Sequence, residues 1–199
     1  MVGANIDNPA LVQRMLNEGH ILGSHTWGHA HMTRLDHKAM MDQILHEERV
    51  FTAVVGDRPF FFRPPYGEIN REITEFLTDR HYIVWKWNFD TFDWNKHKPV
   101  QVYDAALDVA SHGSSGGIML MHEYTWTTEA QKTLIPELKH RGYVIRDPLD
   151  MLTSTEMSQL KQWSCGGDAW SVMEGMCGVL CRGCVECRGG DVWSVVEGM

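Results

Sequence analysis

Short apolar segments alternate with amphipathic segments from the start of the chain to about residue 150. Asn8, Asp36 and Asn70 each precede a segment with apolar residues at helical spacing, and all three side chains are typical N-caps. Further helices are expected over 102–110 and over 128–141, the second interrupted at Pro136 because proline is poorly tolerated inside a helix. The expected strands are the apolar segments 20–24, 60–62, 81–87, 118–121 and 143–145.

This alternation predicts an α/β fold with a parallel sheet or a barrel. In such folds, functional residues gather at the C-terminal ends of the strands. Four polar motifs follow or close the expected strands, and their placement indicates one shared site. The motifs span residues 25–29, 63–67, 90–94 and 120–122.

Composition narrows the class of protein. The 199 residues are 43% hydrophobic and 22% charged, which is typical of a globular chain with one core. The formal net charge of −8 disfavours nucleic acid or an anionic membrane as the main partner. No apolar run approaches the roughly 20 residues that span a bilayer, and residues 1–8 do not form a signal peptide.

The C-terminal segment has a different composition. Segment 166–176 recurs almost unchanged at 189–199, and all five cysteines lie after residue 164. We therefore divide the chain into a domain at 1–152 and a low-complexity, Cys/Gly-rich tail at 153–199, expected to be disordered or an artefact of gene prediction. The alternative is a zinc site built by four thiolates, those of Cys177, Cys181, Cys184 and Cys187.

The motifs together suggest metal-assisted hydrolysis of an amide or ester. His25 and His29 are four residues apart and can present two imidazoles to one divalent cation, which lowers the pKa of bound water. His122 can donate a proton to a leaving group. A carboxylate from Asp90 or Asp93 can hold His122 as a cation and raise its pKa.

Other motif residues suit substrate binding. The turn at Pro64–Gly67 fixes the backbone so that the Tyr66 amide can face an oxyanion, and Tyr66 and Trp94 offer flat apolar faces. Each motif also has an ordinary interpretation, such as a salt-bridged Arg63 or a core histidine at 122. The ordinary interpretations would all have to hold together, for four motifs in this order along one chain, so one shared site is the better interpretation.

The motifs His25–His29, Arg63–Gly67, Asp90–Trp94 and Leu120–His122 resemble motifs two to five of the polysaccharide deacetylases. These are carbohydrate esterases of family 4, with a NodB-homology domain. Segment 87–94 is most similar to the fungal chitin deacetylases. The resemblance covers about residues 1–150 and implies a distorted (β/α) barrel that acts on chitin or a related N-acetylglucosamine polymer.

The resemblance also implies a role for each motif. His25 and His29 would bind zinc or cobalt, with Thr26 bracing the loop between them. Asp90 would tune His122, the general acid that protonates the departing amine. The remaining roles are to orient the catalytic base, supply the oxyanion N–H, line the acetyl pocket and form a groove wall, and they fall to Arg63, Tyr66, Leu120 and Trp94, respectively.

One family motif has no counterpart here. Nothing before His25 matches the Thr-Phe-Asp-Asp-type segment that supplies the family's catalytic base and third metal ligand, and Asp7 is the only aspartate there. We therefore expect an N-terminally truncated domain whose incomplete barrel exposes an unpaired strand edge. The family implies an extracellular or cell-wall location.

Three functions stay open at this point. The chain is a deacetylase, a catalytically dead carbohydrate-binding module, or a metal amidohydrolase that acts on a small amide. Acetate release from chitin oligomers with added zinc separates the first from the other two.

Overall fold

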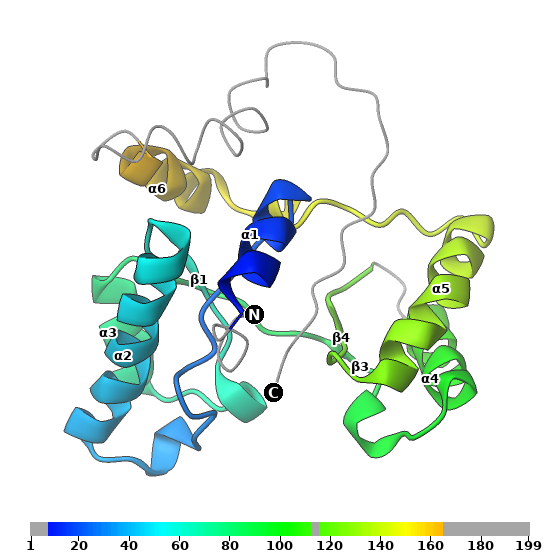
Figure 1. Ribbon diagram of the computed structural model, residues 1–199, viewed down its shortest axis with the longest axis horizontal. Coiled ribbons are helices and arrows are strands. Elements are labelled where there is room, and N and C mark those ends of the chain that lie inside the picture. Colours follow the sequence, from blue (N-terminus) through cyan, green and yellow to red (C-terminus); the bar gives the residue numbers. More distant parts are fainter. Residues whose placement is uncertain (1–7, 113–115, 165–199) are drawn as a thin grey trace.

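The computed structural model describes residues 8–112 and 116–164 (Figure 1). Helix α1 (Pro9–Asn17) begins behind Asn8, whose side chain accepts a hydrogen bond from the Leu11 amide. Helix α2 (His37–Val55) begins in the same way behind Asp36. Both predicted caps are confirmed, because a side-chain oxygen satisfies an amide that has no partner in the first helical turn.

The first parallel strand pair joins β1 (Phe61–Phe62) and β2 (Ile83–Val84). Helix α3 (Arg71–Asp79), capped by Asn70 as predicted, connects the two strands. Figure 1 shows α2 and α3 beside this pair. Their buried faces form a core cluster with the strand: Met32, Met40, Ile44, Phe62, Ile73, Leu77 and Tyr82.

The second parallel pair joins β3 (Phe89–Asp90) and β4 (Met119–Leu120). Helices α4 (Pro99–His112) and α5 (Thr125–His140) pack against each other beside it (Figure 1). Their shared core contains Ala106, Ala110, Met121, Leu134 and Leu138. Each parallel pair is connected through a helix, which is the arrangement that the alternating sequence pattern predicts.

The loops after the strands contain short 3-10 helices. Of these, η3 (Pro65–Gly67) follows β1 and η4 (Asp93–Asn95) follows β3, so both lie at carboxyl ends of strands. The remaining two are η2 (Met32–Arg34) and η5 (Pro148–Met151). Two predicted motifs are therefore placed where α/β folds gather functional side chains.

Three expectations about secondary structure are wrong. Segment 20–24 makes a single parallel bridge, Ser24 to Phe62, instead of a strand. Segment 143–145 contains no strand, and Val144 is 77% exposed, so its apolar run has no sheet to join. Helix α5 continues through Pro136, because burial of Leu134 and Leu138 on either side offsets the hydrogen bond that proline cannot make.

Helix α6 (Ser154–Ser164) lies in the segment that we assigned to the tail. Its Leu160 is buried in a cluster with Phe61 and Ile83, so the packed part of the chain extends past residue 152. The repeated segment and the four cysteines proposed as a zinc site lie outside the described residues. In the part of the chain that the structure describes, no helix is long and apolar enough to cross a membrane.

Candidate active site

His25 and His29 face each other in the loop after Ser24. Their ring centroids are 4.8 Å apart at an interplanar angle of 69°. His25 is 4% exposed, and its Nδ1 donates to the Arg63 carbonyl over 2.6 Å, so this tautomer carries its lone pair on Nε2. A backbone carbonyl on one ring nitrogen is the usual way to orient the other toward a metal. The geometry fits our expectation that this pair binds a divalent cation.

Among residues 8–112 and 116–164, no third metal-binding side chain joins this pair of histidines. Over residues 8–112 and 116–164, no group of three or more histidine, cysteine, aspartate or glutamate side chains is arranged to hold a metal ion. Catalytic zinc commonly has three protein ligands. The described residues therefore offer two imidazoles to a cation.

Tyr66 lies between two histidine rings. Its ring meets His29 edge-on at 4.7 Å and stacks on His31 at 3.9 Å with an interplanar angle of 9°. His31 is held by Glu68 through a 3.1 Å contact to Nδ1, and this hydrogen bond lowers the pKa of Glu68 below its ordinary value. Tyr66 itself is 51% exposed, so the stack fixes a ring that borders solvent.

Arg63 is buried beneath this group. Its side chain is 1% exposed, its Nε donates to the Trp85 carbonyl at 3.3 Å, and its guanidinium lies over the Trp87 ring at 5.9 Å. The indole of Trp87 donates in turn to Asp90 at 3.3 Å. Trp87 thus links the loop after β1 to the loop after β3. Its position was not predicted as a site residue, although it lies in the same segment as Asp90.

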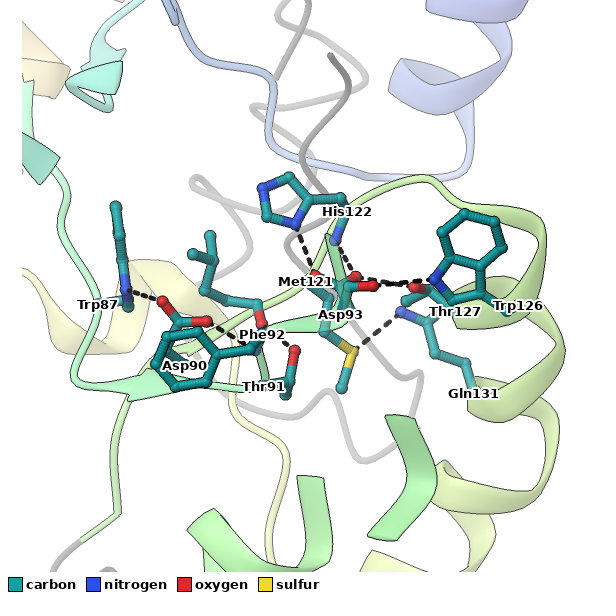
Figure 2. Close-up of polar contacts among 11 residues, drawn as sticks. Trp87, Asp90, Thr91, Phe92, Asp93, Met121, His122, Trp126, Thr127 and Gln131 are labelled. Carbon is teal, nitrogen blue, oxygen red and sulfur yellow. Dashed lines mark hydrogen bonds and ion pairs between the residues drawn. The ribbon is translucent and has the colours of Figure 1, made fainter. Parts of the chain in front are cut away.

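Asp93 holds His122 by two hydrogen bonds (Figure 2). One carboxylate oxygen contacts His122 Nδ1 at 2.6 Å, and the other accepts from the His122 amide at 2.6 Å. Thr127 donates to the second oxygen at 2.7 Å, and the side chain of Asp93 is fully buried. Because Nδ1 faces the carboxylate, Nε2 is the nitrogen of His122 that can serve a substrate. The approach of His122 to the His25–His29 pair stays a prediction.

Asp90, which we expected to tune His122, has different partners. Its carboxylate accepts from the Phe92 amide at 2.8 Å and from the Trp87 indole (Figure 2). The expectation was wrong because the tight turn after β3 directs Asp90 along its own loop and Asp93 inward. Both aspartates sit in the same motif, so spacing alone did not separate them.

The two remaining predicted residues differ in exposure. Leu120 is 4% exposed, and its carbonyl accepts from Thr91 Oγ1 at 2.8 Å. Trp94 is 51% exposed and meets Phe92 edge-on at 6.4 Å. A buried leucine suits an apolar pocket wall and an exposed indole suits a groove wall, as the resemblance implies.

A buried acid that sequence analysis missed lies behind the loop that carries His25 and His29, called the imidazole loop below. Glu47 of α2 is fully buried, and burial raises its pKa from 4.5 to about 7. The Ser24 hydroxyl interacts with this carboxyl and partly offsets the rise, whereas the hydroxyl of Thr26 has no hydrogen-bond partner within the described residues. The hydroxyl of Thr26 therefore does not brace the loop. Helical spacing from the buried Ile44 and Phe51 is the signal that places position 47 on the inward face.

The chain is similar in sequence to known deacetylases. The family model described as "Polysaccharide deacetylase" matches residues 1–85. A peptidoglycan-N-acetylglucosamine deacetylase of Bacillus cereus is 31% identical over 150 residues, which cover 72% of this chain and 68% of that protein. A second one from the same organism is 30% identical over 71% of this chain and 53% of its own length. Chitin deacetylase 2 of Cryptococcus neoformans is 29% identical over 69% of this chain and 33% of its own length.

Solved structures give the same fold. A peptidoglycan N-acetylglucosamine deacetylase superposes with a TM-score of 0.64 at 29% identity, over 70% of this chain and 67% of that chain. A CE4 family pseudoenzyme from Bacillus anthracis superposes with a TM-score of 0.62 at 27% identity, over 69% of this chain and 48% of that chain. These likenesses confirm the predicted α/β barrel type of fold. The chain spans about half the length, 53%, of the Bacillus cereus relative that is 30% identical.

Proposed function

The chain belongs to the polysaccharide deacetylase family, and on that premise we propose that its site removes N-acetyl groups from an N-acetylglucosamine polymer. The observation that carries this proposal is the contact of His122 Nδ1 with an oxygen of the buried Asp93 carboxylate at 2.6 Å. A histidine held in this way presents Nε2 in one orientation and is stabilised as a cation. That is what a general acid for an amine leaving group requires.

In the proposed reaction, water gives one proton to a general base as its oxygen adds to the acetyl carbonyl, the C–N bond then breaks, and the products are acetate and a free amine. His122 gives its Nε2 proton to the departing nitrogen, while Asp93 keeps the ring oriented. The Tyr66 amide donates to the carbonyl oxygen as it gains negative charge. When bound to His25 and His29, a divalent cation, zinc or cobalt, supplies Lewis-acid polarisation of that carbonyl.

Further residues bind the sugar and the acetyl group. In this proposal Leu120 contacts the acetyl methyl, and Trp94 lies against a pyranose ring. Arg63, held under Trp87, would orient a catalytic base of the kind that the family's Asp-Asp segment supplies, for which residues 1–24 have no match. Relatives named for both peptidoglycan and chitin support an N-acetylglucosamine polymer of the cell wall as the substrate class, and hence an extracellular or wall location.

The test is acetate release from N-acetylglucosamine tetrasaccharide by the 199-residue chain with zinc or cobalt added. Where the wild-type chain releases acetate, we expect His122→Ala to lower the rate about 100-fold or more, the range typical of a general acid. His140→Ala is the matched control, since that histidine is 85% exposed on α5. Equal release by wild type and His122→Ala would refute the acid assignment.

A second candidate is a carbohydrate-binding module without activity. It is favoured by the two-imidazole site within the described residues and by the likeness to a CE4 family pseudoenzyme. This candidate predicts that the tetrasaccharide binds and that no acetate is released. Turnover of a small amide without turnover of the tetrasaccharide would instead indicate an amidohydrolase.

A further inference from the structure

Side chains at three of the four positions 90–93, at the end of β3 and in the loop after it, make hydrogen bonds to backbone groups. Asp90 accepts from the Phe92 amide, Thr91 donates to the Leu120 carbonyl at 2.8 Å, and Asp93 accepts from the His122 amide. Thr91 and Asp93 are fully buried. A loop bonded at three of its residues presents the residues between them in a fixed direction.

Phe92 lies between two of these residues and Trp94 directly follows the last of them, and both side chains are large, aromatic and exposed. Phe92 is 52% exposed and Trp94 is 51% exposed. Their rings meet at an interplanar angle of 65° with centroids 6.4 Å apart. Two ring faces at such an angle can contact two different parts of one extended ligand.

Phe92 is also in an unfavourable backbone conformation. Its φ is 50° and its ψ is 36°, in the left-handed region that a bulky L-residue rarely adopts. The Asp90 carboxylate stabilises this turn by accepting the Phe92 amide. Because the Phe92 ring is exposed, its strained backbone is not offset by core packing. A strained residue that exposes its side chain next to a candidate site indicates a role in binding.

Phe92 is continuous with the proposed site, because the next residue, Asp93, holds His122. We infer that Phe92 is an additional contact for a pyranose ring of the N-acetylglucosamine polymer, outside the ring that carries the reacting acetamide, and that Asp90 is its positioning residue. This inference rests on the proposed function. A neutral polymer with apolar ring faces suits an aromatic surface on a chain of net charge −8.

The experiment measures the affinity of the full chain for N-acetylglucosamine hexasaccharide and monosaccharide by calorimetry and ligand-observed NMR. Phe92→Gly should weaken hexasaccharide binding roughly 3- to 10-fold, the range typical of one aromatic contact, and leave monosaccharide binding unchanged. Phe92→Trp should bind as wild type does. Asp90→Ala should also weaken hexasaccharide binding, because it removes the residue that positions Phe92.

Stability separates a binding role from a structural one. Glycine tolerates positive φ, so Phe92→Gly should unfold at the same temperature as wild type or a few degrees higher. The matched control is Tyr143→Ala, which removes another exposed aromatic ring, 37% exposed and in the segment after α5. It should leave hexasaccharide binding unchanged.

The outcomes separate the two proposals. A wild-type chain that binds no hexasaccharide overturns both the proposed function and this inference. If the wild type binds and Phe92→Gly binds equally well, the inference alone fails. Weaker binding by Phe92→Gly without a lower unfolding temperature supports it.

Discussion

At the scale of single residues, the distinction between Asp90 and Asp93 decides how the candidate site works. They are three positions apart, yet one stabilises a turn and the other accepts hydrogen bonds from His122 and Thr127. The sequence identified the motif and the histidine partner. It did not identify which carboxylate faces inward, because that depends on the turn between β3 and η4.

Substituting each aspartate with asparagine tests this distinction. Asp93→Asn should lower the free energy of unfolding by about 2–4 kcal/mol, because a buried acceptor loses its charge and cannot satisfy all three donors. Asp90→Asn should change it by less than about 0.5 kcal/mol, since the amide oxygen still accepts from Phe92. Urea denaturation of the two variants measures the difference. A larger effect at position 90 would contradict the assignment.

At the scale of elements, helix starts were more predictable than strands. Asn8, Asp36 and Asn70 cap helices because their side chains bond to amides three residues on, a local interaction that the sequence contains in full. Each strand comprises two residues, and its pairing depends on partners more than 20 positions away. The segment at 143–145 shows the consequence, since its composition favours a strand and no partner is placed beside it.

Pro136 gives a test at this scale. Pro136→Ala should raise the free energy of unfolding by about 1–3 kcal/mol, because alanine restores the missing amide and removes a clash with the preceding turn of α5. Pro99→Ala is the matched control at the first residue of α4, where proline is favourable, and it should not stabilise the chain. Thermal denaturation followed by circular dichroism compares them. Equal effects at both positions would show that the interior proline carries no penalty.

At the scale of the whole molecule, each of the two strand pairs packs with its own helices into a group with its own core cluster. Core clusters lie within each group, and Trp87 connects the loops between them. Sequence analysis predicted that the motif loops would converge. It did not anticipate that a tryptophan between a guanidinium and a carboxylate would join them, or that an acid would be buried behind the imidazole loop.

That acid makes global stability depend on pH. Burial raises the pKa of Glu47 from 4.5 to about 7, so the native state binds its proton more tightly than the unfolded chain does. The resulting stabilisation is fully present below pH 4.5 and is lost as pH rises through 7, by up to roughly 3 kcal/mol. Glu47→Gln removes the titrating group. Relative to wild type, the variant should gain stability by that amount between pH 4 and 8.

Guanidinium denaturation across this range measures the effect. Glu129→Gln serves as the control, because that glutamate is 59% exposed beside Lys132 and should leave the pH profile unchanged. A wild-type profile that stays parallel to the Glu47→Gln profile at every pH would show that the buried acid does not titrate with unfolding.

The backbone of the motif loops carries one more consequence. Thr26, His29, Tyr66 and Phe92 all have positive φ, and among the described non-glycine residues only His81 shares this conformation. Laboratory evolution for heat tolerance should therefore recruit glycine or asparagine at these four positions early, since both residues relax the backbone there. Variants selected for heat tolerance alone should unfold at a higher temperature and bind carbohydrate more weakly.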